Sequence, residues 1–131
     1  MYNLDSNYTI KTLNREPWII PLADRCNEFL QAYKQNKKIA LMLYEKADTS
    51  TFRYRCYNLY QWTKKSDDWQ CIYFFLDEAQ TILEYLPKCT LFVIVRARWE
   101  HIVDQLIYRA KSLNKKVIFD VDDLIFDINY F

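Results

Sequence analysis

The 131-residue chain contains no glycine, and this absence excludes two common kinds of phosphate site. Gly-x-Gly-x-x-Gly loops and Walker loops need glycine, because their backbone approaches the phosphate closely and adopts positive φ angles. An anion would therefore be held here by side chains or by the amino end of a helix. Turns with positive φ are expected at asparagine or aspartate, and Asn36 and Asn114 are the candidates.

The chain has one histidine, His101, and four irregularly spaced cysteines. No Ser-His-Asp set, Cys-His pair or metal-ligand cluster can be assembled from them, so we expect no bound metal and no other cofactor. Each cysteine lies in or beside an apolar segment, which is typical of small, reduced core residues. The four are Cys26, Cys56, Cys71 and Cys89.

Long apolar runs and an excess of charge are also missing. Apolar runs such as 72–76 and 91–95 are far shorter than the roughly 20 residues that span a bilayer, and residues 1–10 lack the pattern of a signal peptide. The net charge of +1 gives no general attraction to nucleic acid, which we do not expect as a partner. We expect a cytoplasmic protein, and a peripheral contact with the inner face of the membrane would need a local basic patch.

Apolar periodicity alternates between strand-like and helix-like segments along the chain. Strands are expected at 38–44, 69–76, 90–95 and 116–121, and helices at 21–36, 51–64, 78–86 and 98–113. Apolar strands separated by crossover helices predict an α/β domain with a doubly wound, mostly parallel four-stranded sheet flanked by helices. We assign residues 21–131 to this Rossmann-like domain. Residues 1–20 are expected to be an N-terminal arm or lead-in, since residues 1–18 show no clear periodicity.

The expected strand order decides where a ligand would bind. In the common order 3-2-1-4, the first and fourth strands are neighbours, and ligands occupy the crevice beyond their carboxyl ends. The segments that follow these two strands, 45–55 and 120–127, would then face one another across the crevice.

The fourth expected strand ends in a cluster of carboxylates. Asp120 and Asp122 share one face of an extended chain and Asp123 begins the turn, so at least two acids should converge at the carboxyl end of this strand. We expect Asp122 and Asp123 to be catalytic. The alternative interpretation is that these aspartates end the strand and cap a short helix.

Two pairs of arginines follow the other strands. Arg53 and Arg55 lie in the first turn of an expected helix, where the positive end of the macrodipole disfavours cations. We expect them to bind a phosphate or carboxylate, or to pair with the aspartates; the alternative is a solvated pair on an exposed face. Arg96 and Arg98 follow the third strand, and we rank them lower because the assumed order places that strand towards the sheet edge.

Three segments in this order resemble the N-terminal domain of bacterial GT-B glycosyltransferases, which consist of two Rossmann-like domains. The segments are Phe52-Arg53-Tyr54-Arg55 with Asn58, Arg96-x-Arg98-Trp99, and the run from Val117 to Asp127. The resemblance covers about residues 38–127. It implies that Arg53, Arg55, Asn58, Arg96 and Arg98 contact the acceptor, a sugar or a lipid-linked sugar.

The resemblance also implies which part of the enzyme is absent. In such enzymes a second Rossmann-like domain binds the nucleotide-sugar donor, and the resemblance implies that these 131 residues do not include it. The implied function is the acceptor-binding part of an enzyme that transfers a sugar in cell-surface polysaccharide or glycoconjugate synthesis. We expect the segment alone to be inactive.

Other functional classes stay open. Phe119-Asp120-Val121-Asp122-Asp123 also resembles the first motif of haloacid-dehalogenase-like phosphatases. That motif normally begins its domain and is followed by Thr where this chain has Leu124, and the later lysine and acidic motifs have no room here. An aspartate-x-aspartate metal motif of single-domain glycosyltransferases is a further alternative. A non-catalytic domain that docks partners through its Tyr- and Trp-rich surface is another.

Overall fold

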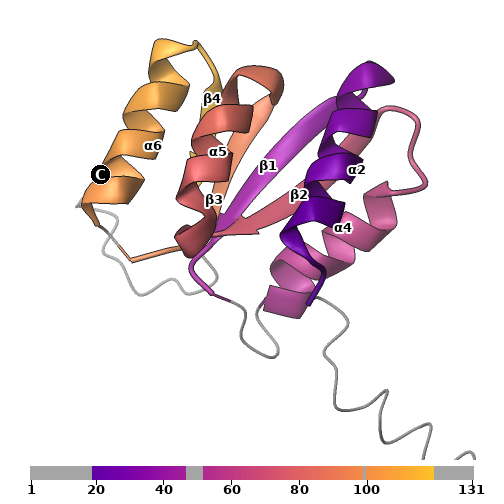
Figure 1. Ribbon diagram of the computed structural model, residues 1–131, viewed down its shortest axis with the longest axis horizontal. Helices are drawn as coiled ribbons and strands as arrows, with labels where there is room; N and C mark the ends of the chain where they lie inside the picture. Colours follow the sequence, from indigo (N-terminus) through magenta and orange to yellow (C-terminus); the bar gives the residue numbers. More distant parts are fainter. Residues whose placement is uncertain (1–18, 47–51, 99, 120–131) are drawn as a thin grey trace, which may run out of the picture.

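The computed structural model describes residues 19–46, 52–98 and 100–119. Within these residues, parallel strands alternate with helices, as Figure 1 shows, and the predicted α/β fold class is confirmed. The strands are β1 (Lys38–Tyr44), β2 (Trp69–Phe75), β3 (Leu91–Arg96) and β4 (Lys116–Phe119). The helices are α2 (Leu22–Lys34), α4 (Asn58–Thr63), α5 (Ala79–Tyr85) and α6 (His101–Ser112). A π-helical segment (Arg53–Tyr57) leads into α4, and 3₁₀ turns (Leu76–Glu78 and Leu86–Lys88) flank α5.

The strand order differs from the expected one. The described strands follow the order β2-β1-β3-β4, so β3 separates β1 from β4, and the predicted order 3-2-1-4 is wrong. Both orders are compatible with right-handed crossover connections. The apolar composition of the strands does not show on which side of β1 the third strand is placed. The burial of the strands agrees with the observed order: every residue of the central strand β1 after Lys38 is buried, whereas the outermost strand β4 is mostly exposed.

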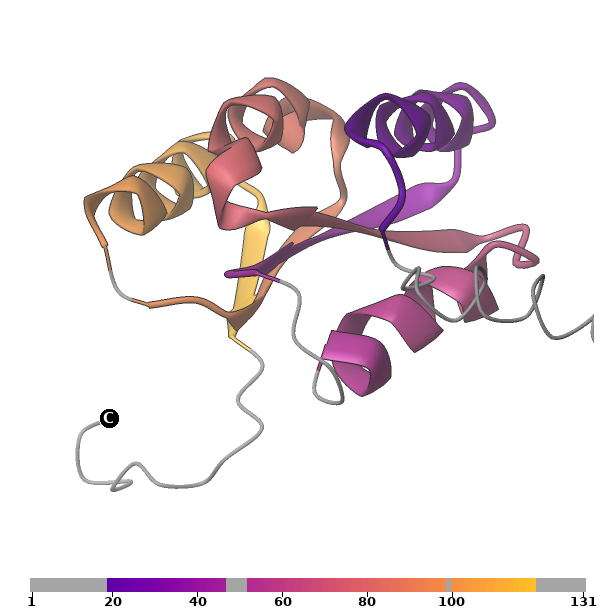
Figure 2. The same ribbon diagram turned by 60° about the horizontal axis from the view of Figure 1, so that its bottom comes forward.

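Helices cover the two faces of the sheet unequally. Figure 2 shows α2, α5 and α6 together on one face, and α4 with the π-helical segment on the other. No helix among the described residues combines the length and the apolarity that crossing a membrane requires.

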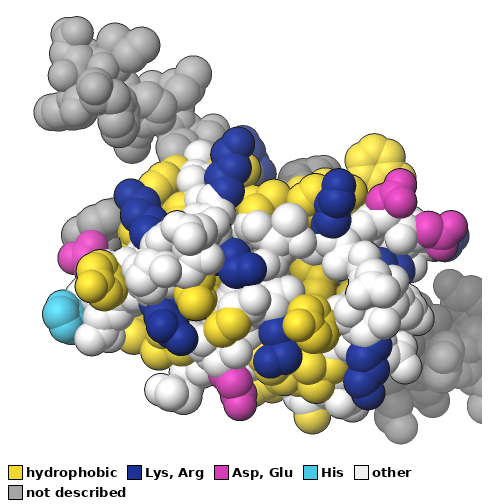
Figure 3. Space-filling model, turned by 90° about the horizontal axis from the view of Figure 1, so that it is seen from above, with side chains coloured by type: hydrophobic (Ala, Val, Ile, Leu, Met, Phe, Trp, Pro, Cys, Tyr) yellow, Lys and Arg dark blue, Asp and Glu magenta, His cyan; other side chains and the backbone are white. Residues whose placement is uncertain are grey.

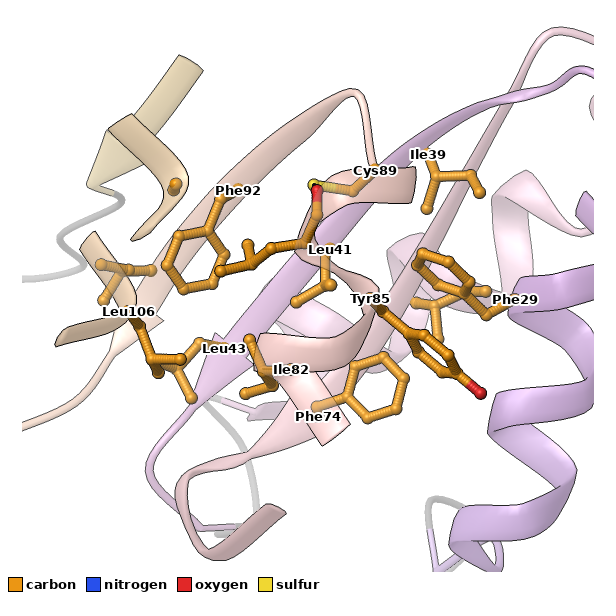
Figure 4. Close-up of a cluster of buried hydrophobic side chains, with 14 of the residues drawn as sticks. Phe29, Ile39, Leu41, Leu43, Phe74, Ile82, Tyr85, Cys89, Phe92 and Leu106 are labelled. Atoms are coloured by element: carbon orange, nitrogen blue, oxygen red, sulfur yellow. The ribbon is translucent and has the colours of Figure 1, made fainter. Parts of the chain in front are cut away.

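The larger core lies under the three helices on one face, as the close-up in Figure 4 shows. The rings of Phe29 from α2 and Tyr85 from α5 stack with centroids 4.6 Å apart, above Phe74 of β2. Burial raises the pKa of Tyr85 to about 12 and that of the Cys89 thiol to about 11. All four cysteines are free, and Cys89 donates its S–H to the carbonyl of Leu86 (3.2 Å), as expected for a protonated core thiol.

Two helices end in the same way beside the amino ends of the strands. We call this side of the sheet the amino edge. Asn36 after α2 and Asn114 after α6 both adopt a φ of 61°, which confirms the prediction for these residues. In each case the next residue returns a hydrogen bond to the helix, from Lys37 to Ala32 (3.0 Å) and from Lys115 to Ala110 (2.9 Å). These bonds satisfy free carbonyls at the helix end and turn the chain into β1 and β4.

Candidate functional site

The switch point of this fold lies between β1 and β3 at the carboxyl edge, where the strands end. After β1 the chain crosses one face of the sheet towards β2, and after β3 it crosses the opposite face towards β4. Ligands in doubly wound folds bind beyond the carboxyl ends of the strands at such a point. The crevice predicted between the first and fourth strands does not exist, because β3 lies between them.

A register shift in β3 places Arg96 at this point. Leu43 of β1 pairs with Ile94, but the next residue, Tyr44, pairs with Arg96 rather than Val95. Val95 is buried and Arg96 is exposed at the edge. Such bulges occur frequently beside functional sites, where they redirect a side chain.

Glu45, the residue after β1, connects the carboxyl ends of three strands. Its N–H donates to the carbonyl of Arg96 (2.6 Å), and its carbonyl accepts from the N–H of Leu76 (3.2 Å) after β2. Its carboxylate accepts from both the backbone N–H (2.8 Å) and the guanidinium Nη2 (2.9 Å) of Arg98. Arg98 is thereby held beside Arg96 at the switch point.

The ion pair between Glu45 and Arg98 keeps both groups charged. The hydrogen bond from the Arg98 side chain lowers the pKa of Glu45, and Glu45 raises the pKa of Arg98. The side chain of Arg98 is 77% exposed, so the pair orients the guanidinium more than it stabilises the fold. Beside it lies an open hollow of about 160 Å³, lined by Tyr44, Glu45, Lys46 and Arg96.

The other predicted arginines lie near the same edge. Phe52, directly before the π-helical segment, packs its ring 5.2 Å from that of Tyr44 at the end of β1 and 5.0 Å from that of Tyr73. This contact fixes the segment that carries Arg53, which is exposed, and Arg55, which is half-buried. π-Helical turns are rare in proteins overall, and many of those that occur lie at functional sites.

Asn58 lies elsewhere. It lines a separate hollow of about 440 Å³ on the outer side of α4, with Gln61, Trp62 and Lys65. Asp120, Asp122, Asp123 and Asp127 lie outside the described residues, so their predicted convergence stays a prediction.

A buried arginine that the sequence analysis did not single out supports the carboxyl edge from α2. Arg25 is 3% exposed and donates to the carbonyl of Tyr73 (3.0 Å) and to both carboxylate oxygens of Glu78 (2.9 and 2.8 Å). Glu78 in turn accepts from the N–H of Phe75 at the end of β2 (2.9 Å). The signal was present in the sequence, because Arg25 stands three residues after Leu22 and four before Phe29, inside the apolar stripe of the helix.

Comparisons with known proteins add no constraint, since the chain matches no protein-family model, no curated protein and no solved structure. Among the described residues, no group of His, Cys, Asp and Glu side chains has an arrangement that could hold a metal ion.

Proposed function

We propose that this chain is the acceptor-side domain of a glycosyltransferase with two Rossmann-like domains, and that sugar transfer requires a second, donor-binding domain. The acceptor would be a sugar or lipid-linked sugar in cell-surface polysaccharide or glycoconjugate synthesis. The observation that carries the proposal is the group of cationic side chains at and beside the switch point of a parallel sheet. The group consists of Lys46, Arg53, Arg55, Arg96 and Arg98.

The chemistry of these side chains suits an acceptor that bears an anionic group. Guanidinium groups bind phosphate and carboxylate in a bidentate manner, and a chain without glycine cannot use a glycine-rich phosphate loop instead. In this proposal Arg96 and Lys46 contact the anionic group in the hollow, and Glu45 positions Arg98 beside it. Asp122 and Asp123 are proposed to act on the acceptor hydroxyl as general base and orienting group.

The binding part of the proposal is tested by calorimetric titration of the chain with glucose 6-phosphate, glucose and UDP-glucose. We expect weak binding of glucose 6-phosphate, weakening roughly tenfold in Arg96→Gln, and no measurable binding of glucose. UDP-glucose should bind no more tightly than glucose 6-phosphate, because the proposal assigns the donor site to a second domain and not to residues 21–131. Micromolar binding of UDP-glucose would contradict the acceptor-side assignment, and no measurable binding of any of the three ligands would favour a docking domain.

The catalytic part needs the complete enzyme. Asp122→Asn and Asp123→Asn keep the ability to accept a hydrogen bond from a helix amide but remove the charge. At least one of them should lower turnover sharply while changing the free energy of unfolding by about 1 kcal/mol or less. Full activity in both variants would show that these aspartates serve only as turn or cap residues.

A further inference from the structure

Lysines gather at the amino edge of the sheet. The sequence Asn-Lys-Lys occurs twice, at residues 36–38 leading into β1 and at 114–116 leading into β4, and Lys64-Lys65 follows the end of α4. Figure 3 looks onto this edge and shows many cationic and few acidic side chains. The segments that form it also contain Arg109, Asp67, Asp68 and Glu84. The nine lysines of the edge are Lys34, Lys37, Lys38, Lys64, Lys65, Lys88, Lys111, Lys115 and Lys116.

Helix ends explain only part of this group. The carboxyl ends of the helices lie at the amino edge, and a cation in the last turn of a helix is favourable there. Lys34 in α2 and Lys111 in α6 are such residues. Lys38 and Lys116 are not, because each is the exposed first residue of a strand.

The kind of cation and its neighbours indicate the partner. The edge is rich in lysine, whose ammonium is a compact charge without the planar fork that arginine offers to phosphates and bases. Aromatic rings lie among the lysines: the ammonium of Lys88 is 5.8 Å from the ring centre of Tyr33, which is 47% exposed, and that of Lys38 is 5.7 Å from Trp69. Lysine clusters with interfacial Tyr and Trp are typical of surfaces that contact anionic lipid headgroups.

We propose that the amino edge docks on an anionic lipid bilayer. The contact is peripheral: lysines attract the headgroup layer, and Tyr33 and Trp69 lie at its level. The inference does not depend on the proposed function, because it uses none of the residues at the carboxyl edge.

This orientation turns the candidate site away from the lipid. A strand of seven residues such as β1 separates the two edges by about 23 Å at roughly 3.3 Å per residue. The hollow beside Arg96 therefore opens on the side of the domain remote from the bilayer. A membrane-attached acceptor would have to extend at least that far from the headgroups.

Sedimentation with lipid vesicles tests the proposal. The full chain is mixed with vesicles of phosphatidylcholine alone or of phosphatidylcholine with phosphatidylglycerol, and the bound fraction is measured. Binding is expected only with phosphatidylglycerol, decreasing with added salt. In Lys38→Gln/Lys116→Gln the partition coefficient should fall about 30-fold, at roughly fivefold per lysine near an anionic surface.

The matched control is Arg53→Gln/Arg55→Gln, which removes the same charge from the opposite edge. Its partition coefficient should change less than about threefold, whereas its binding of glucose 6-phosphate should weaken; the lysine variant should show the reverse. Equal losses in both variants would overturn the proposal in favour of an effect of net charge. Equal binding to both kinds of vesicle would also overturn it, as would tighter binding to polyuridylate than to vesicles. Melting curves by circular dichroism verify that both variants fold.

Discussion

The two edges of the sheet carry cations of different kinds in opposite electrostatic surroundings. At the amino edge, lysines such as Lys34 and Lys111 lie at the carboxyl ends of helices, where the macrodipole favours them. At the carboxyl edge, Arg53 and Arg55 occupy the start of a helical segment, where the dipole disfavours them. The helix dipoles account for lysines in the last turns of helices, but not for the lysines that begin β1 and β4, nor for Arg53 and Arg55. The comparison teaches that the position of a charge relative to the helices is more informative than the net charge of the chain.

The largest expected change is a loss of stability that distinguishes the structural Arg25 from the arginines proposed to bind a ligand. Replacing Arg25 by Ala leaves the carboxylate of Glu78 without its buried partner, and breaking such a pair costs about 3–5 kcal/mol. Urea unfolding of Arg25→Ala measures this loss, with Lys34→Ala on the exposed side of the same helix as control. A loss below about 1 kcal/mol would show that Arg25 contributes no more to the free energy of unfolding than a surface arginine does.

The next effect tests whether the arginines of the carboxyl edge are there for a ligand. Arg53→Ala/Arg55→Ala should weaken the binding of glucose 6-phosphate about tenfold or more. The free energy of unfolding should change by about 1 kcal/mol or less, because Arg53 is exposed and Arg55 only half-buried, whereas Arg25 is buried. Lys38→Ala/Lys116→Ala serves as the control from the amino edge and should leave this affinity unchanged. A stability loss comparable to that of Arg25→Ala would instead assign the pair a structural role.

A smaller effect concerns the turns that carry the lysine pairs. Asn36 has a φ of 61°, and a residue with Cβ but no side-chain amide is less stable in this conformation by about 1 kcal/mol. Asn36→Ala should lose roughly that amount in thermal unfolding, whereas Asn36→Gly should be close to neutral. Equal losses in the two variants would show that the side chain of Asn36 matters more than its backbone conformation.

The smallest effect is the pH dependence of the Glu45–Arg98 pair. Because Arg98 lowers the pKa of Glu45 below its ordinary value of 4.5, the stabilising contribution of Glu45 is complete above that value. It is lost as the pH falls through the lowered pKa of the folded state. The difference in unfolding free energy between wild type and Glu45→Gln should be constant near neutral pH and shrink in acid. A difference that grows in acid would contradict this assignment.

Local patterns predicted the elements of the fold well. Strand β1 has the predicted bounds, and the positive φ angles of Asn36 and Asn114 follow from the absence of glycine. The side chains that face the core were harder to assign. Tyr33 and Leu59 are apolar residues of these helical segments but are exposed, because the buried side of α2 is centred on Phe29 and Ala32 and that of α4 on Tyr60.

The candidate site could be predicted only in part. Arginines after the first and third strands were identified from their positions, but their ranking depended on the strand order, which is a long-range property. In the observed order Arg96 and Arg98 follow a central strand, so the reason for ranking them below Arg53 and Arg55 does not hold. The role of Glu45 depends on three strands meeting at its backbone and side chain, and no local pattern indicates such a junction.

The Arg25–Glu78 pair has a consequence for the synthesis of the chain. The two residues are 53 positions apart, although they meet in the folded domain. Chains grow at roughly 5–20 residues per second, so α2 leaves the ribosome about 3–10 s before its partner does. During this interval the apolar side of α2, with Phe29 and a cation among its apolar residues, has no sheet to pack against. The position of one ion pair thus sets a period of translation in which α2 has been made but cannot yet form its native contacts with Glu78.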